Sequence, residues 1–172
     1  GDIATLANDP ETADAAYNRH VADSTRDPDL LQAALALVDG RLAIAEHGLR
    51  DYLKRHPTDV MAIRMLAEVG ARLGRYPDAE ALLVRALELA PGFAAARHNL
   101  AIVRMRLNKA EAVVHDMDVL LAKDAGNMNY RALRCAALVR LGEYETAIAS
   151  YQSLLSDYTN RPKIWMSLGH VL

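Results

Sequence analysis

The chain has 172 residues, of which 52% are apolar and 24% charged, a balance typical of a soluble globular protein rather than a disordered chain. Its formal net charge of -2 gives no general attraction to a phosphate backbone, so nucleic acid is not an expected partner. The longest apolar windows, such as residues 30–38, are far shorter than the ~20 residues that span a bilayer, so we expect no membrane insertion.

The apolar content comes mainly from Ala, Leu, Val and Met, which favour helices, and aromatic residues make up only 5% of the chain. This composition predicts an all-α protein. Cys135 is the only cysteine, which excludes an internal disulfide and a zinc finger.

Residues 1–25 form an N-terminal extension in which we expect one helix that packs on the helices after it. Asp9 is a candidate N-cap and Pro10 suits the first helical position. Apolar residues follow at helical spacing on one side of this segment: Ala13, Ala16, Tyr17 and Val21.

From about residue 26 the sequence repeats with a period of 34 residues. Aligning residues 63–91 with residues 131–159 places Gly74 over Gly142 and Tyr76 over Tyr144, an offset of 68, or twice 34. Gly40 lies a further 34 residues before Gly74. The register predicts an array over 26–172 with units 26–59, 60–93, 94–127 and 128–161, and the first helix of a fifth unit at 162–172.

Each unit has the pattern of two antiparallel helices. In unit 60–93, an apolar helical stripe begins at Val60, and Gly74 ends that helix because glycine readily adopts a positive φ. Pro77 fits the start of the second helix, and Pro91 ends it. Two helices of this length cannot bury their apolar faces alone, so the units are expected to stack.

These positions resemble the tetratricopeptide repeat (TPR) pattern, which the unit reproduces at Ile63, Leu66, Ala67, Gly74, Tyr76, Ala79, Leu83, Ala86 and Pro91. The resemblance covers most of the chain from residue 26, although Asn108 stands where the turn usually has glycine. It implies a right-handed α-α superhelix of antiparallel helix pairs. It also implies a concave surface along the first helices of the units, here called the first-helix groove, which receives a peptide or a partner helix.

Carrying the register across assigns nine candidate binding residues to this groove: Arg64, Met65, Arg72, His98, Asn99, Met105, Arg106, Asn129 and Arg140. The three arginines at 72, 106 and 140 recur at 34 residues and would suit a carboxylate or phosphate. The competing interpretation is that cations near the ends of helices only complement the helix dipole. Of the six methionines, Met65 and Met105 are expected in the groove and the rest mostly in the core.

The sequence predicts no catalytic residue, metal or cofactor within these residues. No two histidines lie four residues apart, and His115, Asp116 and Asp118 are spread around a helix rather than along one face. Cys135 takes a small-residue position of the repeat, which favours a buried structural thiol. Neither a glycine-rich phosphate loop nor a Gly-x-Ser-x-Gly motif occurs.

The sequence therefore predicts a non-catalytic scaffold that binds a protein, a peptide or a neighbouring domain of its own chain. Because the chain begins at Gly1 and ends inside a unit, we expect a segment of a longer, cytoplasmic protein. Trp165 and Leu168 have no second helix to cover them and are candidates for an end surface that forms a homodimer.

The last residues, PKIWMSLGHVL, resemble the repeat that precedes the catalytic domain of bacterial TPR-containing sulfotransferases. This resemblance implies a sulfotransferase domain beyond Leu172, outside the segment. The alternative is a free-standing TPR adaptor or co-chaperone-like protein in envelope biogenesis or secretion. A clamp for a chaperone tail is disfavoured, since only Asn99 matches the residues of that clamp.

Overall fold

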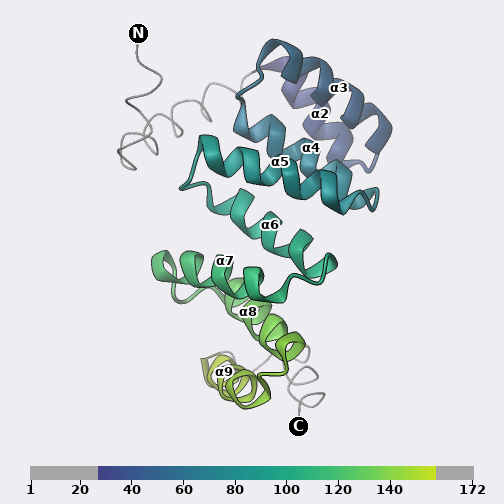
Figure 1. The fold of residues 1–172 in the computed structure, drawn as a ribbon. Helices are drawn as coiled ribbons and strands as arrows, with labels where there is room; N and C mark the ends of the chain where they lie inside the picture. Colours follow the sequence, from purple (N-terminus) through teal and green to yellow (C-terminus); the bar gives the residue numbers. More distant parts are fainter. Residues whose placement is uncertain (1–26, 158–172) are drawn as a thin grey trace. The chain divides into compact units, whose positions relative to one another are not determined.

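The computed structural model describes residues 27–157, which form eight α-helices and no strand (Figure 1). The predicted all-α fold is confirmed. The helices are α2 (Pro28–Val38), α3 (Leu42–Arg55), α4 (Val60–Arg72), α5 (Tyr76–Leu89), α6 (Ala94–Arg106), α7 (Ala110–Lys123), α8 (Met128–Leu141) and α9 (Tyr144–Asp157). The helix expected within residues 1–25 and the first helix of a fifth unit at 162–172 lie outside the described residues.

The helix starts recur at 34 residues. Helices α3, α5, α7 and α9 begin at residues 42, 76, 110 and 144, and α4, α6 and α8 begin at residues 60, 94 and 128. This spacing supports the division into units at residues 59/60, 93/94 and 127/128, which stays a prediction.

Polar N-caps start three of the first helices. Asp27 caps α2 and Asn127 caps α8, each accepting hydrogen bonds from two backbone amides of the first turn. Asp59 does the same for α4, with two amide bonds of 3.0 Å to its Oδ1, and its Oδ2 accepts a hydrogen bond of 3.0 Å from the Tyr52 hydroxyl of α3. This buried carboxylate therefore fixes both the start of α4 and its position against α3.

A residue with positive φ makes each turn between the two helices of a pair. Gly40, Gly74 and Gly142 have φ values of 75°, 75° and 78°, and Asn108 takes the same place with φ 59°. In every turn the next amide donates to the carbonyl five residues earlier, at 2.8 to 3.0 Å. Asparagine tolerates this left-handed conformation better than most residues, so Asn108 preserves the turn.

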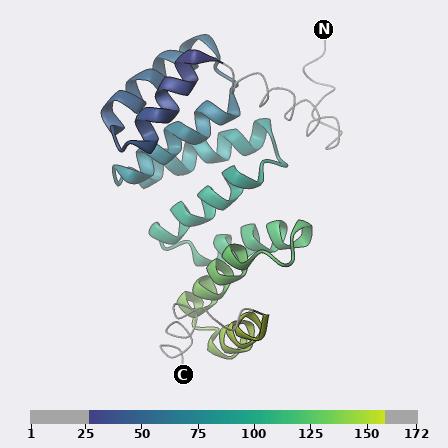
Figure 2. The ribbon, with the colours of Figure 1, turned by 180° about the vertical axis from the view of Figure 1, so that it is seen from behind.

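The chain divides into two compact units, Gly1–Leu100 (unit 1) and Ala101–Leu172 (unit 2). In unit 1, α3 packs between α2 and α4, α4 packs on α5, and α2 also touches α4. Figure 2 shows α2, the most purple helix, beside α3 when the molecule is seen from behind. Side chains of α2, α3 and α4 form the core of this unit, among them Leu37, Leu49 and Val69.

In unit 2, α8 packs against both α7 and α9. Two apolar clusters hold these helices together. One joins α7 to α8 and includes Val113, Met117 and Ala137. The other joins α8 to α9 around Cys135, Tyr151 and Leu154.

Candidate functional site

The exposed face of α4 carries the best-defined part of the predicted first-helix groove. The Glu68 carboxylate lies between two arginines, 3.4 Å from Arg64 Nη1 and 2.6 Å from Arg72 Nη2. Arg64 is largely buried, and its Nε has no hydrogen-bond acceptor among the described residues. A buried donor of this kind is costly unless an acceptor reaches it, so the face holds an ordered cation with a donor to offer.

Arg72 and Arg140 also have a structural partner that the sequence did not reveal. Arg72 Nη1 donates a hydrogen bond of 2.9 Å to the carbonyl of Leu37, near the end of α2. Arg140 Nη1 donates an equivalent bond of 2.9 Å to the carbonyl of Met105, near the end of α6. Both bonds span 35 residues, so the regular spacing of these arginines has a structural explanation. The third member, Arg106, is exposed on α6.

Met65 corrects the sequence interpretation. Its side chain is only 6% exposed and belongs to the core shared by α2, α3 and α4, so it does not line an open groove. Ala62 and Val69 lie on the same stripe of α4 and are buried with it. The reason is that α4 contacts α2 as well as α3, which buries a wider face of the helix than one partner would. Met105 is half-buried and packs against the core of unit 2.

The remaining groove candidates lie on two helices. His98 and Asn99 are half-buried on α6 within unit 1, and burial lowers the pKa of His98. Asn129 is exposed in the first turn of α8. Arg140, near the end of α8, also lines a pocket of about 540 Å³ together with Lys109 and Glu111. A continuous groove through both units stays a prediction, as does the end surface at Trp165 and Leu168, which lies outside the described residues.

The acidic residues of α7 are bound by arginines. Asp116 is 1% exposed, and its Oδ2 lies 2.7 Å from Arg104 Nη1. Asp118 Oδ1 lies 2.6 Å from Arg134 Nε. Among residues 27–157, no three histidine, cysteine, aspartate or glutamate side chains are grouped so that they could hold a metal ion.

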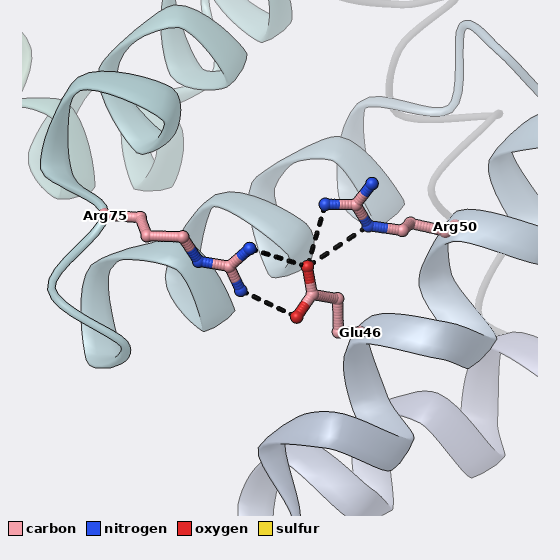
Figure 3. Close-up of polar contacts among 3 residues, drawn as sticks. All are labelled: Glu46, Arg50 and Arg75. Atoms are coloured by element: carbon pink, nitrogen blue, oxygen red, sulfur yellow. Dashed lines mark hydrogen bonds and ion pairs between the residues drawn. The ribbon is translucent and has the colours of Figure 1, made fainter.

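A second ionic cluster joins the two helix pairs of unit 1 (Figure 3). The Glu46 carboxylate of α3 accepts bonds of 2.9 and 2.6 Å from the two Nη atoms of Arg75, in the turn before α5. Arg50 Nη2 and Nε add bonds of 2.8 and 3.1 Å. The hydrogen bonds from Arg75 are the largest cause that lowers the pKa of Glu46 to about 2, burial opposes them, and Arg50 lowers the pKa further. This cluster ties helices together and is not a reactive site.

Sequence reasoning missed a pocket of about 450 Å³ in unit 2, here called the α8–α9 pocket. Its polar wall consists of Arg131 and Arg134 from α8 and Ser150 and Ser153 from α9, and Cys135 also lines it. The signal was present in the alignment at offset 68. There Arg134 falls where the earlier unit has an apolar residue, but a sequence does not show that three helices leave a space at this position.

No helix within residues 27–157 combines the length and apolar character needed to cross a membrane. A tetratricopeptide repeat family model matches residues 30–94, which lie in unit 1. No curated protein sequence matches the chain.

Several solved structures share the fold. MamA from Desulfovibrio magneticus RS-1, as a chain from residue 41 to its end, aligns with a TM-score of 0.75 at 17% identity, covering 90% of this chain and 82% of that one. A crystal structure of MamA aligns with a TM-score of 0.73 at 18% identity and 81% coverage of both chains. MamA AMB-1 aligns with a TM-score of 0.73 at 21% identity, covering 89% of this chain and 80% of the other. At these identities the similarity shows the fold alone.

Proposed function

We propose that this chain is a non-catalytic scaffold that binds a segment of another protein, or of a neighbouring domain, along the exposed face of α4. The observation that carries the proposal is the ordered charge cluster on that face, in which Glu68 holds Arg64 beside Arg72. A fixed donor loses little conformational entropy when it binds, which favours recognition of a carbonyl or carboxylate of a peptide. The match of residues 30–94 to the tetratricopeptide repeat supports the same conclusion.

Site-specific photo-crosslinking tests this function. The photoreactive amino acid p-benzoylphenylalanine is placed at Ala71, one helical turn after Glu68 on α4, and at the exposed Ala81 on α5 as the matched control. In cells that make the protein, we expect a crosslinked protein of constant mass at Ala71 and none at Ala81.

The variant Arg64→Gln should reduce the yield of this crosslink by about tenfold, because a charge-assisted hydrogen bond is lost. Arg85→Gln is the control, since Arg85 is an exposed arginine on α5 that donates only to the Pro57 carbonyl. Equal crosslinking at both positions, or a yield unaffected by Arg64→Gln, would overturn the proposal.

A sulfotransferase domain after Leu172 and a free-standing adaptor in envelope biogenesis or secretion both stay predictions. The residues that suggest the former, 162–172, lie outside the described part of the chain. A homodimer and a cytoplasmic location likewise stay predictions.

A further inference from the structure

The α8–α9 pocket is built like a binding site rather than a packing defect. Its volume of about 450 Å³ falls within the range of roughly 300 to 1,000 Å³ found for small-ligand sites. Two arginines and two serines form its polar wall, and Leu121 from the end of α7 provides an apolar wall. A pocket with one cationic side and one apolar side suits a ligand with an anionic head and an aliphatic stem.

The corresponding positions of unit 1 show why the pocket exists. At the offset of 68 residues, Arg131 and Arg134 correspond to Ile63 and Leu66, and Ser150 corresponds to Leu82. Ile63 is 1% exposed, and Leu66 packs against the core of unit 1. Unit 2 therefore has two cations and a hydroxyl where unit 1 has three aliphatic side chains. Packing alone would retain the aliphatic residues, so the exchange marks a site with another purpose.

The two arginines are held in place by their neighbours. Arg131 Nη2 donates a hydrogen bond of 3.0 Å to Ser153 Oγ of α9. Arg134 Nε donates to Asp118 of α7 at 2.6 Å. A guanidinium has five N–H donors, and neither Nη of Arg134 has an acceptor among residues 27–157. The bond to Asp118 thus orients Arg134 and leaves its fork available to an anion.

The charge of the pocket selects the kind of anion. Two arginines against the single carboxylate of Asp118 leave one positive charge in excess. That excess matches a carboxylate, with one negative charge, better than a phosphate monoester, with about -1.5 to -2. Burial raises the pKa of the Cys135 thiol, while Arg134 and Arg131 lower it, so both cations act on the buried side of the pocket.

We propose that the α8–α9 pocket binds a carboxylate on a short aliphatic stem, presented by the protein partner as a glutamate side chain or a C-terminal residue. Arg131 and Arg134 bind the carboxylate, Ser150 lies beside it, and the stem packs on Leu121. This inference rests on the proposed function as a protein-binding scaffold, but it concerns unit 2, whereas the crosslinking experiment probes α4 in unit 1.

A titration of the full ¹⁵N-labelled chain, followed by backbone amide NMR, tests the pocket with defined probes. N-acetyl-L-leucine mimics a C-terminal residue, and N-acetyl-L-glutamate α-amide mimics a glutamate side chain. Their uncharged counterparts are N-acetyl-L-leucinamide and N-acetyl-L-glutamine α-amide. We expect at least one carboxylate probe to give saturable shifts at Arg131, Arg134 and Ser150, and the uncharged probes to give none. The stronger probe identifies the source of the carboxylate.

Two variants and one control complete the test. Arg134→Gln should weaken binding about tenfold, since it removes a charge-assisted bond. Ser150→Leu restores the residue type of unit 1 and should abolish binding without unfolding the chain. Arg41→Gln is the control, because Arg41 is likewise bound to an aspartate, Asp39, at 2.8 Å, but lies in unit 1.

Three results would overturn the inference: no saturable shift with either carboxylate, binding unaffected by both variants, or inorganic phosphate binding as tightly as the carboxylates. If these appear while the crosslink at Ala71 stands, the pocket assignment fails and the proposed function survives.

Discussion

Replacing Glu46 with glutamine tests how strongly one carboxylate joins the two helix pairs of unit 1. The substitution keeps the size of the side chain and one oxygen acceptor, but it removes the negative charge that Arg75 and Arg50 share (Figure 3). Because Arg75 precedes α5 and Glu46 lies on α3, the charge links elements 29 residues apart.

The size of the effect follows from the pKa of Glu46, which is lowered from 4.5 to about 2. Since one pKa unit corresponds to about 1.4 kcal/mol, this lowering sets an upper limit of roughly 3 kcal/mol. The side chains of Arg75 and Arg50 are 39% and 60% exposed, so water screens much of the attraction. We therefore expect Glu46→Gln to reduce the free energy of unfolding by about 1–2 kcal/mol at neutral pH.

The pH dependence has a definite sign. A carboxyl group whose folded pKa is depressed contributes stability above its unfolded pKa and loses that contribution as the pH falls through the folded value. For Glu46 the contribution should be complete above pH 4.5 and decline toward about pH 2. The difference between the wild-type chain and Glu46→Gln should shrink over the same window.

Urea unfolding followed by far-ultraviolet circular dichroism, at about pH 7 and about pH 2.5, measures this difference. Glu88→Gln is the matched control, because Glu88 is an exposed glutamate of α5 in the same unit. A loss at neutral pH no greater than that of the control, or a difference that persists undiminished near pH 2.5, would refute the reasoning.

Three further predictions concern unit 2 and the turns. Asp116→Asn should cost about 3 kcal/mol in urea unfolding because it breaks a buried ion pair, whereas Asp118→Asn, at an exposed pair, should cost less than about 1 kcal/mol. Arg140→Met should lower the unfolding free energy by about 1 kcal/mol, since it removes a bond to a carbonyl, and if this role is only structural it should leave any partner's affinity unchanged in calorimetry. Gly142→Ala should destabilise by about 1 kcal/mol and Asn108→Gly should stabilise slightly in thermal unfolding, because both positions have positive φ.

Local patterns were enough to predict the helices and turns. The period of 34 residues and the glycines at 40, 74 and 142 indicate where helices end, because these signals act within a few residues of the chain. The turn at Asn108 departs from the usual residue but keeps the same backbone conformation.

Contacts between distant residues could not be read in the same way. The acceptor of Arg72 is a backbone carbonyl 35 residues away, and a carbonyl leaves no mark in the sequence. The burial of Met65 depends on α4 touching two helices at once, which its own periodicity does not show. The α8–α9 pocket arises from substitutions on two helices that matter only once they face a third.

The bonds from Arg72 to the Leu37 carbonyl and from Arg140 to the Met105 carbonyl bear on how such a chain can lengthen during evolution. Every residue carries a main-chain carbonyl, so the acceptor side tolerates any amino acid, as leucine and methionine already illustrate. Only the arginine has to be retained. A tandem duplication of a 34-residue segment copies that arginine together with a new acceptor, so each added copy arrives with the means of joining the one before it.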